Sequence, residues 1–365
     1  MTDPGAPRPS AAVLRAFGAG GRTPVRLDGG RGETWRAGDV VLRPHGDVRE
    51  ARWRSDTLAR LPHTAAFRTP RPVAAAVGGG RSVGTGAVAV GPAGVDRRAV
   101  DPGRVNPGPV DPEPVDPGPV DPGPVDPGPV ELGPVEPGSG DVRSAGPWFV
   151  DGWEAWEWLD GATDPARVED VVRAGSAFEA ALAGLDRPAF LDLVDDPWSR
   201  ADRVVWGAGP AQPDLPRDRA PRTGPPPRTG RLLRTDPLLR RLAGTFRSVR
   251  TPEQPVHGDL LGNVLFSPGQ PPAVFDWAPY WRPAGYGAAV AAVDAVCWHG
   301  VPLRRLGPLG ELAAAPEWPQ LLVRALAFRV VTLHLLGAWD AGSTARHGPV
   351  VDALLSGAAG TLDPS

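Results

Sequence analysis

The sequence predicts an α+β protein in which an antiparallel sheet with one helix precedes a mainly helical part. Between residues 25 and 44, short β-type runs alternate with glycine turns, which is typical of an antiparallel meander. From Asp47, a candidate N-cap, to Leu61, apolar residues recur at helical spacing, and Pro62 ends the run. Beyond residue 161 the apolar runs are longer and mostly follow a helical period.

The composition favours a folded protein of the cytoplasm. The chain has 365 residues, of which 41% are hydrophobic, enough for a sizeable core. A net charge of -3 argues against a general nucleic-acid binder. No apolar run reaches membrane-spanning length, and residues 1–17 lack the features of a signal peptide. The single cysteine, Cys297, excludes an internal disulfide and is expected to be a buried, inert thiol.

Two features of the first strands could contact an anion. Gly29, Gly30 and Gly32 permit a tight turn whose backbone N–H groups can approach a negative charge, although such turns are also ordinary between strands. Arg43 lies near the end of the run VVLRP, where it is either functional or simply reaches solvent. The chain contains no lysine, so every cationic side chain other than histidine is an arginine.

A five-residue repeat occupies Val100 to about Ser139, in units such as VDPGP. Two prolines in most units exclude helices and sheet ladders and favour polyproline II. The tract also lacks aromatic residues and cannot bury a core. We therefore expect residues 80–145 to be a solvated insertion, with a ligand for a proline-recognising partner protein as the alternative.

The insertion interrupts the first part of the chain and is not a domain boundary. After it, two β-type runs flank Asp151-Gly152, a pair that suits a two-residue hairpin turn. The β-type runs before and after the repeat are therefore expected to form one unit, residues 25–160, behind an N-terminal extension of residues 1–24.

The second part, residues 161–365, is expected to be helical. Asp164-Pro165 is a typical helix start, and later runs from Leu238, Ala288 and Leu321 also predict helices. The Pro/Gly/Arg-rich segment 207–230 predicts a flexible loop.

Four polar residues, His257, Asp259, Asn263 and Asp276, lie in the stretches VHGDLLGNVLF, residues 256–266, and AVFDW, residues 273–277. They supply a potential proton acceptor, a neutral oxygen ligand and a second carboxylate, with apolar runs on either side. Hard oxygen ligands of this kind suit Mg²⁺, which takes few protein ligands and usually also binds phosphates. The alternative is a polar turn between two strands.

HGDLLGN followed by FDW resembles the catalytic loop and metal-binding aspartate of the aminoglycoside phosphotransferase-like branch of the protein-kinase-like superfamily. The nearest resemblance is to an uncharacterised group from high-GC bacteria. The resemblance leaves out the repeat and the 207–230 loop. It implies a two-lobed protein-kinase-like fold, in which residues 25–160 are the nucleotide-binding N-lobe and residues 161–365 the C-lobe.

The resemblance also implies roles for individual residues. Asp259 would be the catalytic base, supported by His257, and Asn263 and Asp276 would bind Mg²⁺. Arg43 would replace the usual phosphate-binding lysine, paired with Glu50 of the following helix. The remaining nucleotide contacts would come from the glycine turn over the phosphates and from a hinge whose backbone binds adenine: Gly29, Gly30, Gly32, Glu157, Trp158 and Leu159.

These roles imply an ATP- and Mg²⁺-dependent phosphotransferase acting on a hydroxyl of a small molecule. The alternative, favoured by arginine in place of lysine at Arg43, is a nucleotide-binding pseudokinase with a regulatory or scaffolding role. A third possibility is an interaction protein that works through its repeat. Asp294, the acid of a small-residue helix, could be exposed or could hold the catalytic loop through backbone N–H groups.

Overall fold

The computed structural model describes residues 7–27, 33–76, 148–207 and 228–357. The five-residue repeat and the predicted phosphate-binding turn, with Gly29, Gly30 and Gly32, lie outside the described residues. All of the described residues belong to one compact unit, which comprises Met1–Ala99 and Gly146–Ser365.

An antiparallel five-stranded sheet forms the first part, in the order β1-β2-β3-β5-β4. Its strands are β1 (Val25–Arg26), β2 (Trp35–Ala37), β3 (Val40–Pro44), β4 (Phe149–Val150) and β5 (Trp153–Glu157). Asp151 and Gly152 both have positive φ, 50° and 80°, as a primed hairpin turn requires. The predicted meander and hairpin are therefore confirmed.

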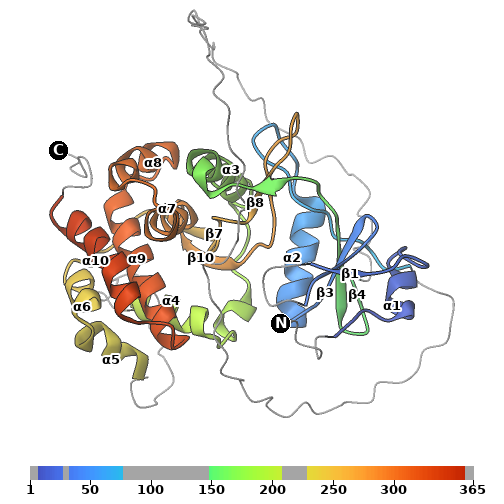
Figure 1. Ribbon diagram of the computed structural model, residues 1–365, viewed down its shortest axis with the longest axis horizontal. Helices are drawn as coiled ribbons and strands as arrows, with labels where there is room; N and C mark the ends of the chain where they lie inside the picture. The colour runs from blue at the N-terminus through green and yellow to red at the C-terminus, as the bar shows by residue number, and fades with distance from the viewer. Residues whose placement is uncertain (1–6, 28–32, 77–147, 208–227, 358–365) are drawn as a thin grey trace, which may run out of the picture. The chain divides into compact units, whose positions relative to one another are not determined.

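Two helices cover opposite faces of this sheet (Figure 1). Leu42 packs with Val13 of α1 (Ala11–Ala16), whereas its neighbour Val41 packs with Leu58 of α2 (Val48–Arg60). Adjacent strand residues point to opposite faces, so the sheet is buried on both sides. The sequence predicts one helix for this sheet, α2, and the structure adds α1 as a second.

The caps of α2 follow the sequence. The side chain of Asp47 accepts a hydrogen bond from the backbone N–H of Arg49 at 2.8 Å, which makes Asp47 the predicted N-cap. The helix ends at Arg60, two residues before Pro62, because proline cannot continue the hydrogen-bond ladder.

Both ends of the residues 77–147 segment are tied to the same part of the molecule. On one side, the backbone N–H of Ala76 donates to the carbonyl of Ala16 at 2.8 Å. On the other side, the indole N–H of Trp148 donates to Asp56 of α2 at 2.7 Å. The chain thus leaves and re-enters at the sheet with α1 and α2.

The second part is mainly helical, as predicted. Its longer helices are α3 (Val168–Ala181), α4 (Pro197–Gly207), α5 (Arg228–Thr235), α6 (Pro237–Ala243), α7 (Tyr286–His299), α8 (Leu306–Leu312), α9 (Trp318–Leu335) and α10 (Ala341–Leu355). The helix predicted from Leu238 begins at Pro237 and ends at Ala243, with Gly244 as its C-cap. No helix within the described ranges has the length and apolarity needed to cross a membrane.

The central helices α7 and α9 are buried on nearly all sides and form the core of the second part. Two small antiparallel sheets lie beside this core: β7 (Glu253–His257) with β10 (Pro279–Pro283), and β6 (Ala162–Thr163) with β8 (Val264–Phe266) and β9 (Ala273–Val274). The predicted α+β class is therefore confirmed. The connections from β7 to β8 and from β9 to β10 contain the polar motif.

Candidate active site

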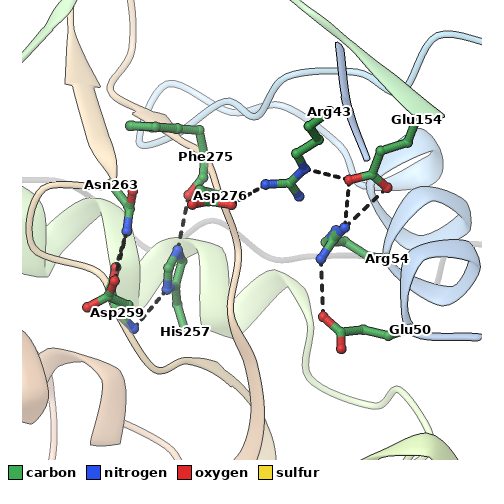
Figure 2. A network of polar contacts seen from close by, with 9 residues as sticks. All are labelled: Arg43, Glu50, Arg54, Glu154, His257, Asp259, Asn263, Phe275 and Asp276. Atoms are coloured by element: carbon green, nitrogen blue, oxygen red, sulfur yellow. Dashed lines mark hydrogen bonds and ion pairs between the residues drawn. The ribbon is translucent and has the colours of Figure 1, made fainter. Parts of the chain in front are cut away.

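The first motif loop joins β7 to β8 and is held by His257. This side chain is fully buried, and its Nδ1 accepts the backbone N–H of Asp259 at 3.1 Å. Its Nε2 lies 3.1 Å from the carbonyl of Phe275, so the ring proton must be on Nε2 (Figure 2). Burial lowers the pKa of His257 and favours this neutral form. One histidine therefore connects the loop of Asp259 to the loop of Asp276.

Asp276 follows β9 and has a backbone conformation that is unusual for a side-chain-bearing residue. Its φ is 46°, in the left-handed region. The residues on either side are fixed: Phe275 N–H donates to Asn263 O at 3.0 Å, and the Trp277 indole donates to Val256 O at 3.1 Å. Strain of this kind is maintained by such surroundings and is concentrated at functional sites.

Close packing beneath the first loop depends on glycine. A Cβ at Gly258 would lie 2.2 Å from Cε2 of Tyr280, and one at Gly175 of α3 would lie 2.1 Å from Cδ2 of Leu260. A side chain at either position would clash with Tyr280 or Leu260, so one of the packed groups would have to shift. The loop that carries Asp259 is therefore seated directly on the core of the second part.

Glu179 of α3 lies under the same loop and was not among the residues predicted from the sequence. Its side chain is 2% exposed and accepts the backbone N–H of His257 at 3.2 Å. Burial raises the pKa of Glu179 to about 8. The available signal was its place in α3, one turn after Gly175, among residues that the helical period assigns to the core.

The raised pKa of Glu179 predicts that the unfolding free energy depends on pH, and Glu179→Gln should weaken that dependence. The unfolded chain releases the Glu179 proton near the ordinary value of 4.5, whereas the folded chain keeps it up to about 8. The folded state therefore binds more protons between these values, and this contribution to stability is lost as pH rises through that window. Urea unfolding at pH 5 and pH 8 should show a larger loss of unfolding free energy for the wild type than for Glu179→Gln. Equal pH slopes would contradict the prediction.

Arg43 lies at the centre of a charge cluster formed by β3, β5 and α2. It faces Glu154 directly across the sheet, and its Nε donates to Glu154 Oε1 at 2.5 Å. Its Nη1 forms an ion pair with Asp276. Glu154 is 1% exposed and also accepts two bonds from Nη2 of Arg54, at 2.8 and 3.2 Å (Figure 2). Burial raises the pKa of Glu154, but Arg54 and Arg43 outweigh it, and the net shift is downward.

The predicted pair between Arg43 and Glu50 was wrong. Glu50 instead accepts from Nη1 of Arg54 at 3.2 Å, one helical turn away in α2. The reason is the strand register, which places Glu154 opposite Arg43 at hydrogen-bonding distance. Glu154 on β5 is therefore closer to Arg43 than Glu50 on α2 is. Arg54 lies between Arg43 and Glu50.

Removing the two carboxylates separately should show which one holds Arg43. Glu154→Gln leaves the buried Arg54 and the partly buried Arg43 without their shared counter-ion, so we expect it to lower the unfolding free energy by about 3–5 kcal/mol. Glu50→Gln removes one partly exposed ion pair, and the expected loss is below about 1 kcal/mol. Urea denaturation of both variants measures the difference. A larger loss for Glu50→Gln would return the supporting role to Glu50.

A cavity of about 480 Å³ lies against Arg43 and Asp276. Its walls are largely apolar and come from both parts of the described chain, including Val41, Leu58, Phe178 and Leu265. The predicted hinge residues Glu157, Trp158 and Leu159 also line it, as does Asn263. A cavity of this size, apolar on its walls and charged at one end, suits a flat apolar group joined to an anion.

Residues of the five-stranded sheet and its turns hold the hinge in place. The backbone N–H of Trp158 donates to Asp39 O at 2.9 Å, and the guanidinium of Arg36 lies over its ring at 3.9 Å. Gly161, the next residue to line the cavity after the hinge, has φ 148°, and a Cβ there would lie 2.9 Å from the carbonyl of Phe266. The backbone turns into the second part at a position that only glycine fits.

Asn263 and Asp276 are suitable ligands for a hard cation. The amide nitrogen of Asn263 donates to Asp259 O at 2.6 Å, which leaves its amide oxygen free to bind a metal. The carboxylate of Asp276 lines the same cavity. Among the described residues there is no group of three or more His, Cys, Asp or Glu side chains that could hold a metal. Two oxygen ligands fit Mg²⁺, whose other positions are usually filled by water and phosphate oxygens.

Asp259 itself is paired with a residue that the sequence analysis missed. Nη2 of Arg329, in α9, donates to Asp259 Oδ1 at 2.7 Å, and the same guanidinium binds Asp294 of α7. Asp294 is 6% exposed, which excludes the solvent-exposed alternative of the two that the sequence left open. Its side-chain partner is Arg329, in place of the backbone N–H groups of the loop. The available signal for Arg329 was a charged residue in a strongly apolar helix, in which Arg324 is the other arginine.

Two solved structures align with most of the chain at low identity. The apo form of a thermostable mutant of aminoglycoside phosphotransferase APH(4)-Ia is 14% identical, with 96% of this chain and 99% of that chain covered and a TM-score of 0.44. An aminoglycoside phosphotransferase from Alicyclobacillus acidocaldarius subsp. acidocaldarius DSM 446 is 13% identical, with 96% of each chain covered and a TM-score of 0.43. No family model and no curated protein matches the chain.

Proposed function

We propose that the chain is an ATP- and Mg²⁺-dependent phosphotransferase that acts on a hydroxyl group of a small molecule. The observation that supports this most directly is that Arg43, Asn263 and Asp276 line one cavity, while Asp259 contacts Asn263 beside it. Phosphoryl transfer requires this combination: a cation and a metal for the phosphates, and a carboxylate for the attacking hydroxyl.

Each residue has a defined task in the proposal. The adenine would lie between the apolar walls, against the backbone of Glu157, Trp158 and Leu159, with its phosphates toward Arg43. Asn263 and Asp276 would hold Mg²⁺, which supplies charge neutralisation at the phosphates when bound. Asp259 would orient the acceptor hydroxyl and accept its proton. Positioning and electrostatic stabilisation then account for most of the rate.

The decisive experiment measures phosphate transfer from ATP to pooled hydroxyl compounds, including aminoglycosides, with Mg²⁺ and with EDTA. Transfer that requires Mg²⁺ is the expected result, and mass spectrometry of the products would identify the acceptor. Failure of ATP to bind, measured by thermal shift over a concentration series, would overturn the proposal.

A second candidate function is a nucleotide-binding pseudokinase with a regulatory or scaffolding role. The ion pair between Arg43 and Asp276 favours it, because the cation then neutralises one of the two proposed metal ligands. Arginine is also a broad planar donor, whereas lysine is a compact point charge, so the two side chains are not equivalent in this position. Tight ATP binding without transfer to any acceptor, with or without Mg²⁺, would support this candidate.

A further inference from the structure

Arg329 is a buried cation in an apolar helix. Its side chain is 12% exposed, and its neighbours Phe328 and Val330 in α9 are fully buried. Burial of an unpaired charge is very costly, so a guanidinium in this position needs a carboxylate partner.

Asp294 of α7 supplies the partner and fixes the guanidinium in place. Nε of Arg329 donates to Asp294 Oδ1 at 2.8 Å, and Nη2 donates to Asp294 Oδ2 at 2.5 Å. This two-point contact determines the orientation of the guanidinium plane as well as its position. Both residues belong to helices packed in the core, so the pair is rigid.

The same Nη2 also reaches the proposed base. It donates to Oδ1 of Asp259 at 2.7 Å, although the Asp259 side chain is otherwise 54% exposed. The other oxygen, Oδ2, lies 3.4 Å from the amide nitrogen of Asn263. An exposed carboxylate would ordinarily rotate about its terminal bond. Here one oxygen is fixed by a rigid donor, and Oδ2 remains for an incoming hydroxyl.

Asp294 also balances the charge of this contact. Arg329 and Asp294 together are formally neutral, so their contact with Asp259 adds a directional hydrogen bond without adding a net positive charge. An arginine without Asp294 would attract the carboxylate more strongly and compete with the hydroxyl proton. The pair therefore suits orientation of a base better than its neutralisation.

We propose that Arg329, held by Asp294, is a positioning residue that orients the Asp259 carboxylate toward the acceptor hydroxyl. The inference rests on the proposed phosphotransferase function and goes beyond it, because Arg329 lies outside the residues that line the cavity. It therefore predicts an effect on turnover that is separate from nucleotide binding.

The test compares two buried arginines of the same helix. Arg329→Gln should lower kcat on the order of 100-fold, the usual cost of a misplaced catalytic group, with the KM and Kd for ATP unchanged. Arg329→Lys, which keeps the charge but loses the two-point contact, should recover part of the loss. Arg324 is the matched control: it is 4% exposed and donates to the carbonyls of Val205 and Arg247. Arg324→Gln should keep kcat per folded molecule within about twofold, since it contacts no proposed catalytic group.

A double variant guards against loss of folding. Replacing Arg329 by methionine and Asp294 by leucine together removes the buried pair from the core, which is often neutral for stability. We expect this variant to fold and to show the same loss of kcat as Arg329→Gln. Full kcat in the double variant, or an equal loss in Arg324→Gln, would overturn the inference. Full turnover in Asp259→Ala would instead overturn the proposed function, so the two failures are distinguishable.

Discussion

Replacing Asp259 by alanine is expected to reduce phosphoryl transfer by about 10²–10⁴-fold, the usual contribution of a general base. Nucleotide binding should persist, because Asp259 lies beside the cavity and is not among the residues that line it. Single-turnover transfer from labelled ATP measures the first quantity, and thermal-shift titration with ATP measures the second. Together they separate loss of chemistry from loss of the site.

The matched control is Asp195→Ala. Asp195 has a comparably exposed side chain, at 63%, and its partners Arg200 and Arg203 lie on the surface helix α4. Its removal should leave both measurements within about twofold, because exposed ion pairs contribute little. Retained turnover in Asp259→Ala would rule out Asp259 as the base.

The second large effect is expected from Asp276→Asn, which should weaken the binding of Mg²⁺ with ATP. Loss of one of two protein oxygen ligands is expected to weaken Mg²⁺-dependent ATP binding at least on the order of 100-fold, more than the loss of a supporting contact. The change also releases Arg43 from its ion pair, so ATP binding in EDTA should be retained or strengthened. Calorimetric titration with ATP in Mg²⁺ and in EDTA tests both expectations.

Asp151→Asn is the control for backbone conformation. Asp151 also has a left-handed φ, of 50°, but lies in the hairpin turn between β4 and β5. Asparagine tolerates this region, so neither substitution should disturb the backbone. An Asp276→Asn protein that binds ATP and Mg²⁺ as the wild type does would contradict the assignment of Asp276 as a metal ligand.

The local parts of the fold could be predicted from the sequence because their determinants are close together. The turn at Asp151-Gly152, the cap at Asp47 and the helix start at Asp164 each depend on residues within one or two positions. The polar motif is also compact: His257 connects its two halves through contacts to residues 259 and 275. Short-range chemistry of this kind is visible in the order of residues.

The contacts that were missed join residues that are far apart in the chain. Arg43 and Glu154 are separated by 111 positions, Asp259 and Arg329 by 70, and His257 and Glu179 by 78. Which side chains meet over such separations depends on strand register and on how helices pack. The sequence indicates that Arg43 needs a carboxylate partner. The register of β3 with β5 makes that partner Glu154 and not Glu50.

The two fixed ends of the interrupted segment have a consequence for how this chain can change over evolutionary time. Ala76 is hydrogen-bonded to α1 and Trp148 to α2. By chain statistics, doubling the length of a connection between two fixed points adds only about 0.6 kcal/mol of closure entropy. Copies of the VDPGP unit can therefore be gained or lost at little thermodynamic cost, while Arg43 and Glu154, on strands either side of the break, keep the cavity in register.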